Sequence, residues 1–151
     1  MSYFWDIFQN IPLRAAFFGW LLAQLTKGFA ALKRTGKVDW GRFFGPGGMP
    51  SSHTSSVIAA TISVGMTAGF SSPVFAIGTV FSLVVMYDAT GVRWETGKQA
   101  EAINELVEII KGKQHLTGEK LKELIGHSPL EVWTGFALGV AVGVVVTLLS
   151  V

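Results

Sequence analysis

Four long apolar runs dominate this chain of 151 residues, at about 11–33, 54–71, 73–92 and 129–151. Each approaches the roughly 20 residues that an α-helix needs to cross the hydrocarbon core of a bilayer. Half of the residues are hydrophobic and the mean hydropathy is +0.47, which is too apolar for an ordinary soluble domain. We therefore predict an all-α integral membrane bundle with about four transmembrane helices, in a single domain over 1–151.

Two of these runs depart from a simple membrane span. The run at 11–33 is interrupted by Arg14 and Lys27, and the run at 54–71 is short and rich in Ala, Ser and Gly. Small residues let helices approach each other closely in lipid, so we keep 54–71 as a span. A soluble four-helix protein is the alternative.

The segments around the runs carry signals of their own. Residues 1–10 are rich in aromatic side chains, which favour the headgroup level of a membrane. Ser71-Ser72-Pro73 is a tight break with a capping serine and a proline suited to a first helical turn, so 54–71 and 73–92 should form a helical hairpin. In the polar segment 94–128 we expect an amphipathic helix on the membrane surface or against the bundle, because apolar residues follow helical spacing at Ile103, Leu106, Val107 and Ile110.

The order of the spans predicts which segments meet. The first span ends, the second begins, the third ends and the fourth begins on one side of the membrane, with both termini on the other. Nearly all basic residues fall on the first side, whereas the side of the termini has only Arg14. The positive-inside rule then places the first side at the cytoplasm.

Composition argues against several classes of function. The chain has no cysteine, so disulfides and thiolate metal sites are excluded. The net charge is only +2 and no sustained basic and aromatic stripe is present, so we expect no nucleic-acid partner. No group of carboxylates and histidines has metal-ligand spacing, and we expect chemistry without a metal or cofactor. His115 stands in the polar loop without supporting residues and is given no role.

Two histidines precede long apolar runs. His53 follows Gly47-Gly48-Met49-Pro50-Ser51-Ser52 at the start of the second run. A helix N-terminus suits a phosphate, Ser51 and Ser52 offer hydroxyl donors, and Gly48 lets the backbone approach an anion. His53 itself could transfer a proton near neutral pH. A glycine-rich loop with capping serines and a solvated histidine is the structural alternative.

The second histidine, His127, precedes the fourth run and is followed one helical turn later by Glu131. A neutral imidazole at a helix start can attack phosphorus, and a carboxylate nearby can hold the ring. Ser128-Pro129-Leu130-Glu131 also fits a capping box, so a purely structural role for Glu131 is the alternative.

Three cations complete the candidate site. Lys27 and Arg34 lie seven residues apart and share a helix face. Arg93 closes the third span, where its guanidinium fits phosphate geometry and Asp88 could orient it. An ionisable residue in an apolar span is a functional candidate, although snorkelling to the headgroups explains such residues about equally well.

These residues resemble the type-2 phosphatidic acid phosphatase superfamily, which also includes vanadium haloperoxidases, and most closely its small divergent bacterial and plastid branch. The superfamily pattern is Lys-x6-Arg-Pro, then Pro-Ser-Gly-His, then Ser-Arg-x5-His-x3-Asp. Here Thr35, Ser52 and Glu131 replace the proline, glycine and aspartate, and Leu121 stands where the last motif has arginine. The matching stretches are Gly47–His53, Tyr87–Ala100 and Gly126–Val132.

The resemblance implies a membrane lipid phosphate phosphatase in a bacterial inner or plastid-type membrane. It implies His127 as nucleophile and His53 as acid, with Lys27, Arg34 and Arg93 holding the phosphate. The substrate would be phosphatidate, phosphatidylglycerophosphate or a polyprenyl phosphate or pyrophosphate. The alternatives are a catalytically weak anionic-lipid-binding or scaffold protein, vanadate-dependent halide oxidation, and an anion transporter or channel. Oligomeric state, including a homo-oligomer, stays open.

Overall fold

The computed structural model describes residues 3–37, 40, 48–111 and 128–151. Within these ranges the chain is helical apart from short turns, with no strand, as the sequence predicts. The helices are α1 (Tyr3–Gln9), α2 (Ile11–Thr35), α4 (Ser52–Ala68), α5 (Pro73–Thr90), α6 (Val92–Lys111) and α7 (Pro129–Leu148). α2, α4, α5 and α7 correspond to the four predicted spans, and α6 to the predicted amphipathic helix.

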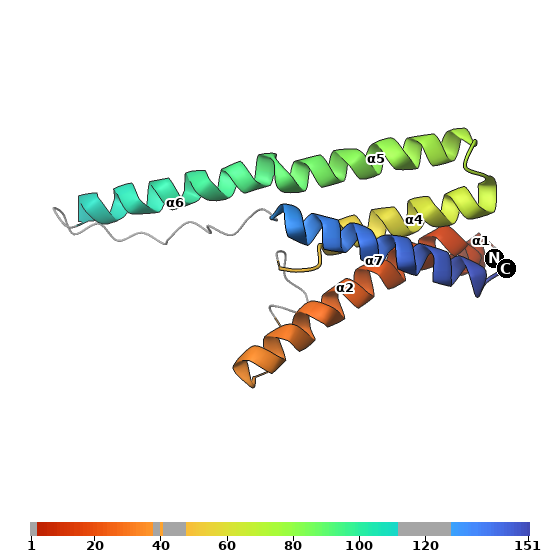
Figure 1. Cartoon of the computed structure of the whole chain (residues 1–151), viewed down its shortest axis with the longest axis horizontal. Helices are drawn as coiled ribbons and strands as arrows, with labels where there is room; N and C mark the ends of the chain where they lie inside the picture. Colours follow the sequence, from red (N-terminus) through yellow and green to blue (C-terminus); the bar gives the residue numbers. More distant parts are fainter. Residues whose placement is uncertain (1–2, 38–39, 41–47, 112–127) are drawn as a thin grey trace.

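Three segments are long and apolar enough to cross a membrane: Ile11–Thr35, Pro73–Val107, which contains α5, and Pro129–Leu148. α4 has 17 residues and therefore extends about 26 Å at 1.5 Å per residue, at the short end of the range for a membrane span. It lies among the other spans rather than at their edge (Figure 1). The all-α membrane fold with about four spans is thus confirmed.

The helix boundaries follow from local residues. Asn10 caps α2, with its side-chain oxygen accepting from the backbone N–H of Leu13 at 3.1 Å, and α2 ends where Gly36 adopts a φ of 67°. The predicted hairpin break is also present, because the Ser72 hydroxyl accepts from the N–H of Phe75 at 3.2 Å and Pro73 opens α5. Side-chain caps of this kind satisfy backbone groups that helix ends leave unpaired.

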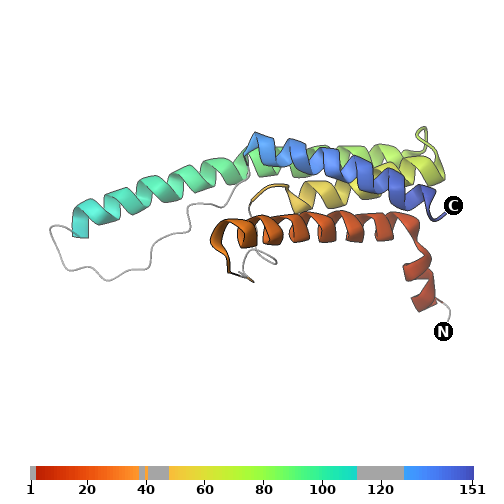
Figure 2. The ribbon, with the colours of Figure 1, turned by 60° about the horizontal axis from the view of Figure 1, so that its bottom comes forward.

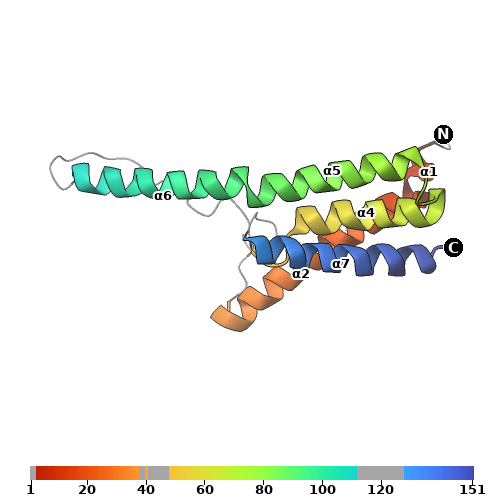
Figure 3. The same ribbon diagram turned by 45° about the horizontal axis from the view of Figure 1, so that its top comes forward.

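α4 is the central helix of the bundle, in contact with α2, α5 and α7 (Figures 1 and 3). α2 and α7 also contact each other, whereas α6 packs only on α5 among the described elements. α6 continues the direction of α5 and extends beyond the bundle (Figure 1). Among the described elements, α6 thus contacts only the span that it continues, and the structure shows no packing of its described part across the other spans.

A row of glycines brings α7 close to α4. Gly135, Gly139 and Gly143 are spaced by four residues, so they share one face of α7. A Cβ added at these three positions would lie 2.5 to 2.7 Å from carbonyl oxygens of α4 or its cap, at Ser51, Ser55 and Ala59. Glycine is needed because any side chain would push the two backbones apart.

Hydroxyl groups join the helices inside the bundle. Ser55 Oγ donates to the carbonyl oxygen of Gly19 on α2 at 3.0 Å, and Thr147 Oγ1 donates to Ser63 Oγ at 2.8 Å between α7 and α4. A third link joins Thr61 of α4 to Ser82 of α5 at 3.0 Å. These small polar residues hold together helices that have no hydrophobic driving force for association in lipid.

The outer surface of the bundle is apolar. Large side chains of α5 are mostly exposed, among them Val74, Ile77, Val80, Phe81, Leu83 and Val84. Such a surface suits lipid chains rather than water. At the end that holds both termini, α1 turns across the direction of α2 (Figure 2), with Trp5 and Phe8 exposed. This arrangement matches the predicted aromatic lead at headgroup level.

Candidate functional site

The two predicted helix starts meet in space. The backbone N–H of Ser51, which precedes α4, donates to the carbonyl oxygen of Glu131 in the first turn of α7 at 2.9 Å. The C-terminal ends of α2 and α5 lie toward this same end of the bundle, and both termini lie at the other (Figures 1 and 3). The predicted gathering of four span ends on one side is therefore correct.

Each of the two helices begins with a capping serine. The Ser51 hydroxyl accepts from the backbone N–H of Thr54 at 3.4 Å and from the Thr54 hydroxyl at 3.1 Å. At α7, the Ser128 hydroxyl accepts from the N–H of Glu131, and the Glu131 carboxylate accepts from the N–H of Ser128 at 3.1 Å. The capping box that the sequence offered as the structural alternative for Glu131 is thus formed.

Lys27 reaches this junction from α2. Its side chain is only 6% exposed, and Nζ donates to Ser52 Oγ at 3.2 Å. Gly48, with a φ of 81°, lies over the aliphatic part of Lys27, whose carbons would be 3.8 and 3.9 Å from an added Cβ. An ammonium group that leaves water needs polar partners, and Ser52 supplies one of them.

The charge of Lys27 has a counterpart on α7, because its ammonium group is attracted electrostatically by the Glu131 carboxylate. Among the described residues the two groups form no salt bridge, so the structural task that the contacts show for Glu131 is the capping of α7. An ammonium group carries three N–H donors, so two beyond the Ser52 bond could serve a ligand. The junction combines a cation, hydroxyls and the positive ends of two helix dipoles, which together suit an anion.

The remaining predicted site residues are distributed unevenly around this junction. His53 lies in the first turn of α4 and is exposed, next to the buried Ser52. Arg34 is exposed in the last turn of α2, two turns beyond Lys27, where α2 extends past the start of α4 (Figure 1). Asp88 is partly buried near the end of α5. The structure thus brings together Lys27, Ser52 and Glu131, and leaves Arg34 outside this cluster.

Two predicted residues cannot be placed by their side chains. Arg93 belongs to α6, but its side chain is not among those described. His127 immediately precedes Ser128 in the sequence and lies outside the described residues. Their roles stay predictions from the sequence.

Gln24 was missed by the sequence analysis. It lies one turn before Lys27 on α2 and is 5% exposed, and its Oε1 has no hydrogen-bond partner in the part of the chain that the structure describes. A buried amide oxygen without a partner is costly and therefore unusual. The sequence feature that could have identified Gln24 is its position three residues before Lys27, because residues three apart are neighbours on a helix surface.

Within the described ranges, no group of three or more His, Cys, Asp or Glu side chains is placed to hold a metal ion. The polar groups that do converge are a lysine, serine hydroxyls and one glutamate. This set suits binding of an anion through hydrogen bonds and charge.

An apolar outer surface around a bundle with a buried cation at one end defines an integral membrane protein. More specifically, the chain belongs to the divergent PAP2 family, whose model matches residues 8–142. It is also 35% identical, over 146 residues, to the uncharacterized membrane protein YuiD of Bacillus subtilis (strain 168), covering 89% of this chain and 92% of that protein. No solved structure matches the chain. The resemblance drawn from the three motifs is therefore confirmed.

Proposed function

We propose that this protein is a membrane lipid phosphate phosphatase that acts through a phosphohistidine intermediate. The observation that carries the proposal is the buried Lys27 ammonium group, bonded to Ser52 at the junction of the α4 and α7 helix starts. An anionic headgroup could reach this end of the bundle while its acyl chains stay against the apolar outer surface. Membership of the divergent PAP2 family supports phosphatase-like chemistry.

In the proposed reaction, an imidazole nitrogen of His127 attacks phosphorus and forms a P–N bond. The bond from phosphorus to the leaving oxygen breaks, and His53 gives that oxygen a proton. Water then attacks the phosphohistidine and gives a proton to His53, and the P–N bond breaks to release inorganic phosphate. Lys27 and Arg34, with Arg93, would hold the phosphate oxygens, while Ser51, Ser52 and the backbone at Gly48 shape their surroundings. Glu131 would hold His127, and Asp88 would orient Arg93.

Phosphate release by the purified full-length protein tests this proposal. The substrates are phosphatidate, phosphatidylglycerophosphate and a polyprenyl phosphate and pyrophosphate, each presented in mixed micelles. His127→Ala should lower the rate on an accepted substrate by a factor on the order of 10³ or more, as expected for a nucleophile. His115→Ala is the matched control because it removes a histidine that has no assigned role. Undiminished turnover by His127→Ala contradicts the assignment.

A second candidate is an anionic-lipid-binding protein without turnover. The capping box favours it, because both the backbone N–H and the carboxylate of Glu131 are already engaged at the start of α7. The same lipid panel separates the two functions. Binding of a lipid phosphate that depends on Lys27, with no phosphate release from any substrate, supports this second function.

A further inference from the structure

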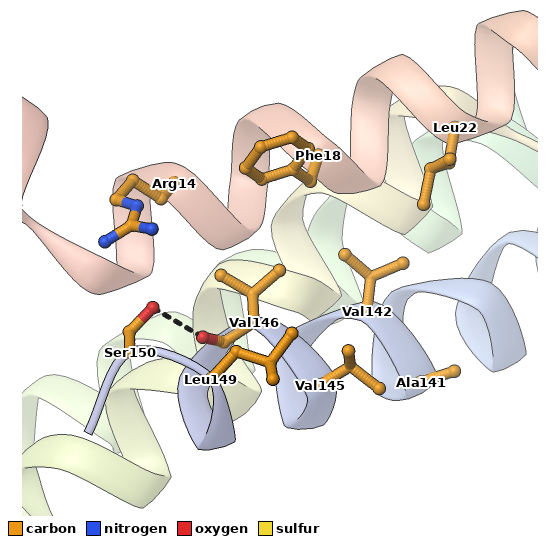
Figure 4. A pocket seen from close by; sticks show the side chains of 9 residues that line it. All are labelled: Arg14, Phe18, Leu22, Ala141, Val142, Val145, Val146, Leu149 and Ser150. Atoms are coloured by element: carbon orange, nitrogen blue, oxygen red, sulfur yellow. Dashed lines mark hydrogen bonds between the residues drawn. The ribbon is translucent and has the colours of Figure 1, made fainter.

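A groove lies between α2 and α7 on the half of the bundle opposite the Lys27 junction. Its volume is about 450 Å³. Phe18 and Leu22 line it from α2, facing valines of the C-terminal half of α7 (Figure 4). Leu22 and Phe18 follow Arg14 at four-residue spacing, so the three side chains form one row along α2.

The groove has one charged end. Arg14 lies at the end of the row nearest the termini, and Ser150, just beyond the end of α7, lies across from it (Figure 4). The Ser150 hydroxyl is already used, since it donates to the carbonyl oxygen of Val146 at 2.6 Å. Arg14 is exposed, and among the described residues no carboxylate forms a salt bridge with its guanidinium.

An apolar groove with a cation at one end matches the acyl chain and the phosphate headgroup of a phospholipid. Leu22 lies eight positions after Arg14, so the lining of α2 extends roughly 12 Å along the bundle, which is the direction in which an acyl chain runs. Arg14 lies in the first turn of α2, next to α1 with its exposed Trp5 and Phe8, and therefore at the level of the headgroups. Its planar guanidinium fits a phosphate diester, and the lining includes no acidic residue to repel one.

We propose that this groove binds an anionic phospholipid from the leaflet on the side of the termini. One acyl chain occupies the groove between α2 and α7, and the headgroup phosphate pairs with Arg14. The site is separate from the Lys27 junction, which lies toward the other membrane face, so it would be a structural lipid site rather than a substrate site. Its existence does not depend on catalytic activity.

The test uses full-length protein reconstituted in nanodiscs of phosphatidylcholine with a minor fraction of phosphatidylglycerol. Native mass spectrometry of protein released from these nanodiscs counts retained lipid. Wild-type protein should retain phosphatidylglycerol in preference to phosphatidylcholine. Arg14→Gln should lower this preference by about tenfold, the scale of one charge-assisted hydrogen bond, whereas Arg14→Lys should keep part of it.

Two further variants test whether lipid retention depends on Arg14 and on the groove in particular. Lys33→Gln removes an exposed cation from the other end of α2 and should leave lipid retention unchanged. Val145→Phe fills the groove from α7 and should lower retention of both lipids, because the acyl chain loses its place. An unchanged preference in Arg14→Gln overturns the proposal. It is also overturned if wild-type protein leaves the nanodiscs as a dimer that Val145→Phe dissociates, because the groove is then occupied by a second copy of this chain.

Discussion

The N–H of Ser51 and the carbonyl oxygen of Glu131 form a 2.9 Å hydrogen bond that joins the start of α4 to the start of α7. Ser51 is the cap residue of α4, so its N–H lies outside the helix and needs a partner elsewhere. Glu131 provides that partner because Gly135, one turn later, has no side chain to separate the two backbones. The position of the two motifs relative to each other thus depends on a glycine outside both.

Gly135→Ala should therefore destabilise the protein. The new Cβ would lie 2.5 Å from the carbonyl oxygen of Ser51, which is backbone and cannot rotate away. Forcing apart such closely packed segments typically costs about 1–3 kcal/mol. Thermal unfolding in detergent measures the loss. Ala137→Val adds carbon to the exposed face of the same helix and should have little effect, so equal melting temperatures for the two variants would contradict the packing argument.

The hydroxyl pair formed by Thr147 and Ser63 should contribute to the association of α7 with α4. Thr147 is 1% exposed and its Oγ1 donates to Ser63 Oγ at 2.8 Å. In a double-mutant cycle with Thr147→Val and Ser63→Ala, we expect a coupling energy of about 0.6 kcal/mol, the average for hydrogen bonds between membrane helices. Free energies of unfolding in mixed micelles supply the four values. A coupling energy of zero would mean that the bond makes no net contribution.

Lys27→Met separates ligand binding from folding. A buried ammonium group is costly to desolvate, and an apolar side chain of similar length removes that cost at a position where, among the described residues, no carboxylate forms a salt bridge with the lysine. We expect unchanged or higher thermal stability together with a fall in phosphate release of about 10² or more. Lys33→Met, an exposed lysine on the same helix, is the control. Lower stability with intact turnover would assign Lys27 a structural role instead.

Glu131→Gln tests whether the carboxylate does more than cap α7. Glutamine is accepted at the third position of a capping box, so this variant should fold almost as well as wild type, whereas Glu131→Ala should lose about 1 kcal/mol. If the negative charge holds His127, both variants should lose turnover to a similar extent. Thermal melts and phosphate-release rates measured on the same preparations make the comparison. Full activity in Glu131→Gln would leave capping as the sole function of this residue.

The sequence could predict the boundaries of the spans because caps and breaks are local. Ser72-Pro73 and the Ser128 to Glu131 box act within one helical turn, and both are found as expected. The meeting of span ends also followed from the sequence, since consecutive membrane helices alternate in direction. The position of α6 could not be predicted from the sequence, because apolar spacing shows that a helix is amphipathic but not where it packs.

The central position of α4 in the bundle could not be predicted from the sequence, for a different reason. In lipid, hydrophobic side chains face outward as readily as inward, so α5 is the most exposed span despite its apolar sequence, while the Ser- and Ala-rich α4 is buried. The exposure of Arg34 could not be predicted either. Arg34 shares a helix face with Lys27 as predicted, but only Lys27 is buried, because that difference depends on where α2 passes beyond its neighbours.

The absence of cysteine from this chain makes its orientation directly measurable. Single cysteines can replace Lys98, in α6, and Val151, at the chain end. α6 extends beyond the bundle on the side away from the C-terminus (Figure 1). The excess of basic residues on the side of the Lys27 junction favours the cytoplasm for that side. In intact bacterial cells, a membrane-impermeant maleimide should therefore label Val151→Cys but not Lys98→Cys. After lysis, both should react.

A third variant, Ile77→Cys, controls for membrane depth in this experiment. Ile77 is 69% exposed on the outer face of α5 but should face lipid rather than water. Because a maleimide reacts with the thiolate, which hydrocarbon does not support, Ile77→Cys should stay unlabelled both before and after lysis and react only in denaturant. Labelling of Lys98→Cys alone in intact cells would reverse the orientation. Labelling of Ile77→Cys in intact membranes would contradict the assignment of α5 as a lipid-facing span.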